Sequence, residues 1–541
     1  MTKPRQAPAE DALQAPAGAL EESREPSSTK STSGGVERVG SYSLAATTLA
    51  LSIGMLVQRF SQLWPWVVDD SYITLRYARH LANGEGLRWN PNETPVEGFT
   101  SFFWVVLTAV PHALGTDAVA FAKVVSLLLV GASAAFSASL SWQWLPANTA
   151  LRFAASVAAA VLVCASPMTA IHSASGMETA LFTALVVGFA NLATLFTNAP
   201  SRTLAWALSS LCLLLGLARP EGNVLALVVV ASALLGSGAS AATPETRRAM
   251  LTWPLLVGYI LPGTVYFIAR WRFFGLPLPL PFFIKAAAGW EGIDEVVGFY
   301  RQGVGWLGIL ALVGFISFRR SWPLALALVI HSLFYLKPAH LMGFSHRYLF
   351  PYFPLVAAAA VLGVARLLRS HPRAAAYAVL GAAVMASCAW LSDAQSDIAS
   401  QLAYARGLDH AHVRLGHDLK GLASQAGAPL RLVISDAGAV PYFSDWLTLD
   451  SFGLNDLEIA RTGKREVDYI YRDNPDAVVV LSHERERFVP RLSWEEPIGR
   501  AAMARGYGVG GIYEFGAPEE PPFGGYYLWV LTRPGLPALT K

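Results

Sequence analysis

The sequence predicts a polytopic α-helical membrane protein with about eleven transmembrane helices, followed by an extracytoplasmic α/β domain. Three observations support this fold class. Of the 541 residues, 53% are hydrophobic and 15% are charged, whereas soluble proteins carry about 25% charged residues. Apolar runs of roughly 16–25 residues, near the length that a helix needs to cross a bilayer, recur through residues 42–391. The final segment, residues 392–541, is polar and about one domain in size.

Residues 1–41 are the first element, and we expect them to form a disordered cytoplasmic tail. They are rich in Ser, Glu, Pro, Ala and Gly and have almost no large apolar side chains, so they cannot bury enough surface to fold. No cleavage site of small residues follows at the distance that a signal peptide requires. We therefore expect the first apolar run, at about 43–66, to remain as an anchor.

The transmembrane domain is expected over residues 42–391. After the first run, its apolar runs lie near 117–140, 152–170, 176–196, 203–218, 222–238, 251–269, 303–318, 322–336, 347–365 and 374–391. The segment 99–114 is also apolar, but as a full span it would invert every later loop. We therefore expect this segment to be a helix at the membrane interface.

Basic residues in alternate loops give the expected orientation of these spans. The loops on the side of the N-terminus contain Arg152, Arg202, Arg247, Arg248, Arg319, Arg320, Arg366, Arg369 and Arg373. An excess of Lys and Arg marks the cytoplasmic side of a membrane protein. The sequence therefore predicts a multi-pass membrane protein with a cytoplasmic N-terminus and an extracytoplasmic C-terminal domain.

The C-terminal segment, residues 392–541, has the pattern of an α/β domain. A short apolar strand at 430–435 is followed by Asp436 and Gly438, and a second strand-like run at 477–481 follows a helical stretch. Such alternation of strands and helices is typical of α/β folds.

Charge and cysteine content exclude several other functions. The formal net charge is +3, from 41 basic and 38 acidic residues, which gives no reason to expect a nucleic-acid partner. The three cysteines, Cys164, Cys212 and Cys388, lie inside apolar runs, so we expect packing thiols and neither a disulfide framework nor a metal cluster.

The predicted first external loop, residues 67–116, contains two adjacent carboxylates where the first span leaves the membrane. Desolvation at that interface and mutual repulsion raise the pKa of one of the two groups, Asp69 and Asp70. A carboxylate so placed is suited to take a proton from an attacking hydroxyl. In the alternative interpretation, Asp69 caps the next helix and Asp70 is simply solvated.

Several motifs in this loop and beyond it resemble those of a known family. The loop contains Asp-Asp-Ser-Tyr-Ile (69–73), Arg-Tyr-Ala-Arg (76–79) and Pro-Val-Glu-Gly-Phe-Thr (95–100). Further matches are Ser-Gly-Met-Glu-Thr (175–179), Arg-Pro-Glu-Gly (219–222), His-Arg-Tyr-Leu (346–349) and Asp-Ala-Gly-Ala-Val-Pro-Tyr (436–442). Together they resemble GT-C glycosyltransferases that use a polyprenyl-phosphate sugar, and most of all the mycobacterial terminal β-(1→2)-arabinofuranosyltransferase type.

The resemblance implies an activity and its partners. A sugar, arabinofuranose in the most similar type, would pass from a polyprenyl-phosphate donor to a glycan or lipid acceptor on the extracytoplasmic face, with inversion. Asp69 or Asp70 would be the general base, and the family's motif favours Asp69. No cofactor is certain, and because some GT-C enzymes use a divalent cation, the resemblance leaves a metal ion open.

The resemblance also requires external cations, because the leaving group is a phosphate. Lys285 and Arg347 are the best candidates, and Arg219 and Arg270 are also predicted to be external. Their alternative role is to reach lipid headgroups. Further substrate-binding candidates are Arg76, Glu97, Glu178, Glu221 and His346. For Glu178 and Glu221, interaction with a helix N-terminus is an equal alternative, and Arg219 is near enough in sequence to pair with Glu221.

Two other classes of function compete with an enzyme. A secondary transporter would place ionisable residues near the middle of its spans, but here they cluster at the external ends. A membrane-anchored glycan-binding protein would not need so many spans. The sequence therefore favours a glycosyltransferase over both.

Overall fold

The computed structural model describes residues 32–235, 243–285, 290–318, 320–338, 342–426, 429–516 and 523–536, and Leu539. The chain divides into two compact units, Met1–Leu44 and Ala45–Lys541. Of the first unit, only the beginning of helix α1 (Thr32–Gln62) is described. The expected disordered tail thus lies outside the described residues up to residue 31 and is helical from Thr32 onward. All that follows concerns the second unit.

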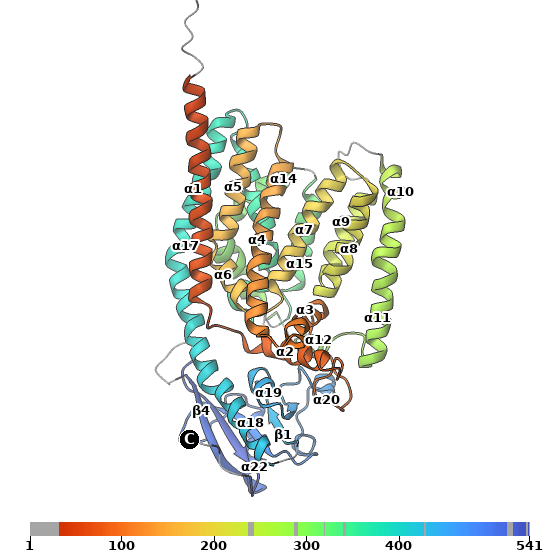
Figure 1. Ribbon diagram of the computed structural model, residues 1–541, viewed down its shortest axis with the longest axis vertical. Helices are drawn as coiled ribbons and strands as arrows, with labels where there is room; N and C mark the ends of the chain where they lie inside the picture. The colour runs from red at the N-terminus through yellow and green to blue at the C-terminus, as the bar shows by residue number, and fades with distance from the viewer. Residues whose placement is uncertain are drawn as a thin grey trace, which may run out of the picture. The chain divides into compact units, whose positions relative to one another are not determined.

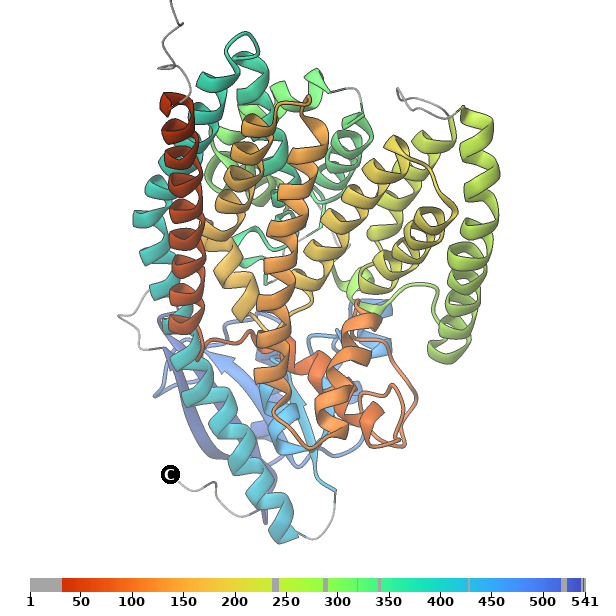
Figure 2. The ribbon, with the colours of Figure 1, turned by 45° about the horizontal axis from the view of Figure 1, so that its top comes forward.

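Most of the second unit is a bundle of helices (Figures 1 and 2). The α-helices up to the end of this bundle are α2 (Asp69–Ala82), α3 (Phe102–Ala113), α4 (Ala118–Trp144), α5 (Thr149–Ala165), α6 (Pro167–Ala174), α7 (Thr179–Asn198), α8 (Arg202–Ala218), α9 (Gly222–Leu235), α10 (Pro244–Leu255), α11 (Leu261–Phe274), α12 (Leu280–Lys285), α13 (Ile293–Gly298), α14 (Leu307–Ser317), α15 (Trp322–Phe334), α16 (Phe353–Leu367) and α17 (Pro372–Leu408). Short π or 3-10 segments join some of them: η1 (Leu256–Ile260), η2 (Phe299–Val304), η3 (Phe344–His346), η4 (Phe350–Tyr352) and η5 (Asp409–Val413).

The number of membrane spans differs from the expected number. Among the described residues, six helices are long and apolar enough to cross a membrane, or eight if each of two bent helix pairs is one span. The other expected runs fall on shorter apolar helices, namely α8, α9 and α15. The predicted total of about eleven spans is therefore not confirmed, although apolar helices occur at each expected run. The segment expected at the interface is the short helix α3.

Proline and glycine account for the two bent pairs. The axes of α5 and α6 differ by 57°, and α6 begins at Pro167, which has no N–H to continue the hydrogen bonds of α5. The segment Ile293–Val304 and helix α14 differ by 92°, and Gly305 between them has a φ of +56°. Both bends lie at the end of the bundle that carries the candidate site.

Two glycines allow α14 and α16 to pack with their backbones in contact. A Cβ on Gly314 would lie 1.9 Å from the carbonyl oxygen of Ala359, and a Cβ on Gly363 would lie 2.0 Å from that of Leu310. Small residues at such crossings are typical of helices that pack inside a membrane.

The C-terminal region is a domain built around a mixed five-stranded sheet, as the α/β pattern predicts. Its strands are β1 (Arg431–Ile434), β2 (Leu447–Asp450), β3 (Ala477–Ser482), β4 (Gly508–Gly516) and β5 (Tyr526–Thr532). Its helices are α18 (Arg414–Ala426), α19 (Ala439–Ser444), α20 (Leu457–Thr462), α21 (Val467–Ile470) and α22 (Glu495–Ala504). The strand order is β2-β1-β3-β5-β4. Strands β2, β1 and β3 are parallel, and β5 is antiparallel to both β3 and β4.

Strand β1 lies at the point where the direction of the chain connections reverses, because β2 and β3 lie on its two sides. In open α/β sheets, ligands bind outside the carboxyl ends of the strands at such a point. In this protein the residue at that position is Asp436, in the loop between β1 and α19. This loop packs against the start of α2.

The first loop and the C-terminal domain share one hydrophobic core, which fixes their relative position. Tyr72 and Trp89 of the first loop are buried in the same cluster as Leu415 and Trp446 of the domain. Figure 1 shows α2, α3 and α12 between the helix bundle and the sheet. The first loop thus forms the surface against which the C-terminal domain packs.

Candidate active site

Asp69 and Asp70 begin helix α2, but their carboxylates have different surroundings. Asp69 is buried, and its Oδ1 accepts a hydrogen bond of 2.7 Å from the backbone N–H of Ala439 in the C-terminal domain. Its own backbone N–H donates to the Tyr404 hydroxyl at 3.2 Å. Burial raises the pKa of Asp69 to about 7, although the nearby His412 lowers it. Asp69 therefore connects the membrane part to the C-terminal domain.

Asp70 is the more exposed of the two residues. Among the described residues, no hydrogen bond or ion pair engages its carboxylate, so both oxygens keep free lone pairs. Burial raises its pKa, and the positive charges of Lys285 and Arg347 oppose that rise. Asp70 thus lies near the basic residues of the site and is free to accept a proton.

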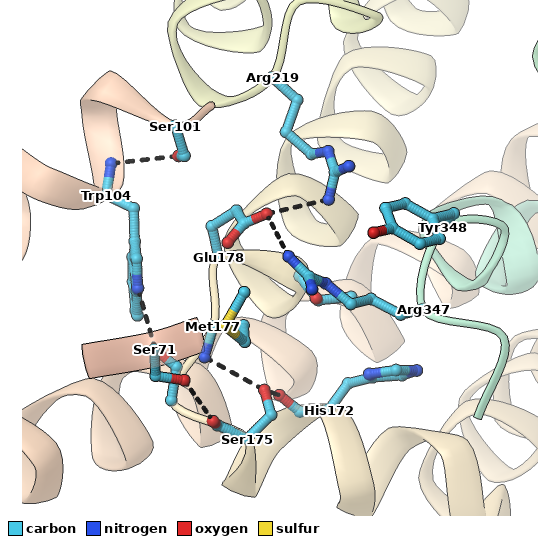
Figure 3. A network of polar contacts seen from close by, with 12 residues as sticks. Ser71, Ser101, Trp104, His172, Ser175, Met177, Glu178, Arg219, Arg347 and Tyr348 are labelled. Carbon is cyan, nitrogen blue, oxygen red and sulfur yellow. Dashed lines mark hydrogen bonds and ion pairs between the residues drawn. The ribbon is translucent and has the colours of Figure 1, made fainter. Parts of the chain in front are cut away.

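A carboxylate between two arginines is the centre of the basic cluster. Glu178 Oε1, at the N-cap of α7, accepts hydrogen bonds of 2.9 Å from Arg219 Nη1 and 3.1 Å from Arg347 Nη2. Figure 3 shows both guanidinium groups pointing toward Glu178, with the ring of Tyr348 beside them. Although burial raises the pKa of Glu178, the two arginines hold it below its ordinary value. Glu178 is therefore ionised and fixes the orientation of both arginines.

Arg347 has hydrogen-bond donors without a partner in the described part of the protein. Its Nε and Nη1 atoms are buried and have no hydrogen-bond partner there, and the residue is only 4% exposed. An unsatisfied buried guanidinium is costly, so these two atoms mark a place where an anion would be stabilised.

Three positively charged groups lie around the ring of Tyr348. The charged groups of Arg219, Lys285 and Arg347 lie 5.3, 5.5 and 5.3 Å from the ring centre, and Lys285 Nζ donates a hydrogen bond of 3.0 Å to the Tyr348 hydroxyl. Although burial raises the pKa of Tyr348, these cations bring it below its ordinary value. The surrounding cations thus make this phenol more acidic than that of an ordinary tyrosine.

These residues line a cavity of about 350 Å³. Its wall contains four basic residues and one acidic residue: Arg219, Lys285, Lys337, Arg347 and Glu221. Glu221 pairs with Arg219 (Nε to Oε1, 2.5 Å), as the sequence allowed, and accepts a hydrogen bond of 2.6 Å from the Tyr335 hydroxyl. Phe282, Leu333 and Phe334 supply apolar surface. The cavity therefore suits an anion that is attached to an apolar chain.

The loop before Arg347 has a strained backbone. Met342, Ser345 and His346 have φ values of +52°, +48° and +58°, a region that side chains with a Cβ rarely adopt. His346 is held in place by a contact of 2.8 Å between its Nδ1 and Glu295 Oε1. It lines a separate polar cavity of about 630 Å³ rather than the basic one. Strain of this kind is found where a functional side chain must be aimed, and here that side chain is Arg347.

The C-terminal domain brings a second ionic pair to Asp69. His412 Nε2 lies 2.9 Å from Asp436 Oδ2, and the Tyr526 hydroxyl donates to the same oxygen. Burial lowers the pKa of His412, but Asp436 and Asp69 together raise it above its ordinary value. The pKa of Asp436 is lowered, and both shifts favour the charged form of the pair. Asp436 is close enough to influence the pKa values of both Asp69 and Asp70.

Glu97 and Arg270 pair with each other outside this cluster. Arg270 Nε lies 2.9 Å from Glu97 Oε2, and burial raises the pKa of Glu97 to about 7 against the effect of Arg270. Both residues line a cavity of about 260 Å³ between α8 and α11, with Tyr266, Phe267 and Leu278 among its apolar walls. Among the residues that line this cavity, Thr100 also lines the basic one.

Arg76 also lies outside the cluster. It is 1% exposed and donates to the carbonyl oxygens of Trp89, Pro441 and Trp446. A further hydrogen bond of 3.1 Å reaches Asn90 Oδ1. Its donors are thus occupied by the first loop and the C-terminal domain, and we assign it no contact with substrate.

The structure therefore brings together four of the predicted residues in one cavity wall: Arg219, Glu221, Lys285 and Arg347. Glu178 is bonded to two of them, and Asp70 lies nearby. Sequence reasoning missed the roles of Tyr335, Tyr348, His412 and Asp436. Tyr348 and Asp436 lie in motifs that the sequence singled out, so their motifs were a usable signal. Tyr335 and His412 have no such signal.

No group of three or more His, Cys, Asp or Glu side chains in the described ranges is arranged to hold a metal ion.

Comparisons with known proteins extend these observations. Residues 405–522 match a family described as a domain of unknown function (DUF8728). No curated protein matches the chain. ArnT from Cupriavidus metallidurans, solved bound to undecaprenyl phosphate, is 15% identical with a TM-score of 0.54, over 94% of this chain and 99% of that one. The archaeal oligosaccharyltransferase AglB from Archaeoglobus fulgidus, solved with an inhibitory peptide and a dolichol-phosphate, is 14% identical with a TM-score of 0.51, over 81% and 69%.

At these identities the likeness shows the fold alone. It confirms the coarser part of the predicted fold class, since the fold is similar to that of the membrane proteins ArnT and AglB and the chain ends in a sheet domain. The finer resemblance to the mycobacterial arabinofuranosyltransferase type stays a prediction.

Proposed function

We propose that this protein is a glycosyltransferase of the GT-C type that takes a sugar from a polyprenyl-phosphate donor. The observation that carries the proposal is the basic cavity beside Asp70, in which Arg347 has two buried donor atoms without a partner. Two structures with the same fold, ArnT and AglB, were solved with undecaprenyl phosphate and dolichol-phosphate. Both ligands are polyprenyl phosphates, which supports this class of donor.

The donor phosphate binds at Arg347, Lys285 and Arg219. A guanidinium group donates charge-assisted hydrogen bonds to phosphate oxygens, and the lysine adds a point charge. Glu178 accepts hydrogen bonds from both arginines and so fixes their positions, while the Nε and Nη1 atoms of Arg347 remain without a partner. The prenyl chain leaves this phosphate along the apolar wall formed by Phe282, Leu333 and Phe334.

Asp70 is the general base. The acceptor hydroxyl loses its proton to Asp70 as its oxygen attacks the anomeric carbon. The bond from that carbon to the phosphate oxygen breaks at the same time, and the leaving phosphate takes the electron pair while the cations stabilise its charge. Attack opposite the leaving group inverts the anomeric centre. We assign this role to Asp70 rather than Asp69 because the Asp69 carboxylate already accepts the N–H of Ala439.

The C-terminal domain completes the acceptor side of the site. Asp436 lies beyond the carboxyl end of β1 and is close to both aspartates of α2. Its pair with His412 fixes its carboxylate, so its remaining oxygen is suited to accept a hydrogen bond from an acceptor sugar. The acceptor is a glycan or lipid of the cell envelope on the extracytoplasmic face, and arabinofuranose is the first sugar to test, because the first-loop motif resembles that type.

Donor binding by purified variants tests the proposal. Arg347→Ala should weaken the affinity for a polyprenyl-phosphate sugar about 10- to 100-fold, since a hydrogen bond to a charged group contributes about 1.5–3 kcal/mol. The matched control is Arg272→Ala, which removes an exposed arginine from α11 and should leave the affinity unchanged. Equal affinities in the two variants would remove the phosphate site. If the protein is instead a glycan-binding protein that transfers no sugar, the wild type will give no product from any donor.

A further inference from the structure

A buried arginine lies at the opposite end of the helices from the candidate active site. Arg247, in the first turns of α10, is 2% exposed. Its Nε atom is buried without a hydrogen-bond partner, and no ion pair in the described part of the chain includes its guanidinium. Helix α7 (Thr179–Asn198) begins directly after the active-site residue Glu178, so its 20 residues separate the two ends by about 30 Å.

Arg247 faces a small cavity of about 50 Å³ between α7, α8, α9, α10 and α15. Arg320 lines the same cavity and also donates to Asn198 Oδ1. The described lining contains two arginines and no carboxylate. Its hydroxyl groups, Thr194, Thr197 and Ser232, donate their protons to carbonyl oxygens of their own helices. The Arg247 guanidinium, with its unpartnered Nε atom, is therefore the donor that a ligand would meet.

The burial of Arg247 needs an explanation that membrane topology does not give. An arginine that only reaches lipid headgroups keeps its charged end exposed at the surface of the bundle. Arg248, the next residue, does so: it is exposed. Arg247 instead points between helices. A buried charge without a counter-charge costs several kcal/mol, and an anion in this cavity would offset that cost.

The geometry points to a binding site for a phosphate group at this cavity, with Arg247 as its main ligand. A water molecule needs about 10–15 Å³ of such a volume, so 50 Å³ has room for about four oxygen-sized groups, the number in one phosphate. The N-terminus of α15 also borders the cavity through Trp322, Pro323 and Leu324, and helix N-termini favour negative charge. The site is independent of the donor site and does not depend on the proposed function.

The phosphate has two possible sources, an anionic phospholipid headgroup and free phosphate. Basic pockets between transmembrane helices are known to hold anionic headgroups. Figures 1 and 2 show that α9 and α10 meet at the end of the bundle away from the sheet domain, so a headgroup could reach this site from the membrane surface at that end.

Thermal unfolding of the full-length protein tests the site. In phosphatidylcholine, addition of phosphatidylglycerol should raise the Tm if a lipid supplies the phosphate, and inorganic phosphate in lipid-free detergent should raise it if free phosphate does. Arg247→Gln should weaken the apparent affinity for the stabilising anion about tenfold or more, because a charge-assisted hydrogen bond is lost. The control Arg202→Gln removes an exposed arginine at the start of α8 and should respond as the wild type does.

A second variant keeps the test decisive if Arg247→Gln does not fold. Ser232→Asp places a carboxylate in the cavity as a built-in counter-charge. It should unfold at or above the Tm of the anion-saturated wild type, and it should lose the response to added anion. The site is disproved if Arg247→Gln responds as Arg202→Gln does, if neither anion stabilises the wild type, or if Ser232→Asp lowers the Tm and still responds.

Discussion

Asp69 and Asp70 are neighbours in the sequence, but their carboxylates have different surroundings. Asp69 accepts a backbone hydrogen bond from the C-terminal domain, whereas Asp70 has neither a hydrogen bond nor an ion pair among the described residues and lies near Lys285 and Arg347. The sequence predicted that the pair carries the chemistry, but it could not separate them, because the partner of Asp69 lies 370 positions further along the chain. The first aspartate, which the motif favours, is the one that the fold engages.

The pKa of Asp70 gives a prediction for the pH profile. Burial raises this pKa, and a general base must be ionised, so the rate should fall on the acid side at a pH clearly above the ordinary value of about 3.9. The check is kcat measured from acid to neutral pH with saturating donor. An acid limb at the ordinary carboxyl value, or none, would contradict the assignment.

Stability should depend on pH in the opposite direction. A carboxyl group with a raised pKa binds its proton more tightly in the folded state, so it contributes most at low pH and its contribution is lost as the pH rises through the raised value. For Asp69 the window runs from about 4 to about 7. Asp69→Asn, which can still accept the N–H of Ala439, should flatten the fall in Tm across that window. A Tm profile identical to that of the wild type would show that Asp69 is not protonated there.

At the scale of secondary-structure elements, the loop between β1 and α19 decides how the domain meets the site. The sequence predicted strand β1 correctly and singled out Asp436 and Gly438 after it, but it did not reveal the structural role of Gly438. A Cβ on Gly438 would lie 2.2 Å from the backbone oxygen of Asp69 and 2.3 Å from its Oδ2. The glycine is thus required by a contact between elements that are far apart in the chain, which local patterns do not reveal.

Gly438→Ala should therefore impair both folding and transfer. The added methyl group must displace Asp69 or the loop, at a cost of about 1–3 kcal/mol, and should move the start of α2 relative to Asp436. The measurements are Tm and the transfer rate. The control is Gly421→Ala in α18, where a Cβ meets nothing within 4 Å; it should be neutral or slightly stabilising. If the two variants behave alike, the close contact is not essential.

At the scale of the whole molecule, composition and patterning were enough to predict a helical membrane part and an α/β domain. The predicted number of about eleven spans is not confirmed, because helices such as α8 and α15 are too short to be assigned as spans by length. Composition and patterning also did not show that the C-terminal domain packs against the first loop. That arrangement depends on Arg76, which the motif suggested as a substrate ligand and which the fold uses as a clamp.

Arg76→Gln should loosen the C-terminal domain. The change removes hydrogen bonds from a buried guanidinium to Pro441 and Trp446, a loss on the order of 3 kcal/mol. Limited proteolysis and hydrogen exchange at residues 436–450 should both become faster. Arg500→Gln, which breaks only an exposed pair with Glu496 on α22, should change either measurement little. Equal protection in the two variants would contradict the role of Arg76 as a clamp.

If Asp70 is the base of a transfer from a polyprenyl-phosphate sugar, its loss should be visible in single-turnover transfer by purified protein. Asp70→Asn should bind donor as the wild type does but transfer on the order of 10²–10⁴-fold more slowly. Asp69→Asn, which keeps its hydrogen bond to Ala439, should lose less. Full transfer by Asp70→Asn, with donor binding intact, would show that Asp70 is not the general base.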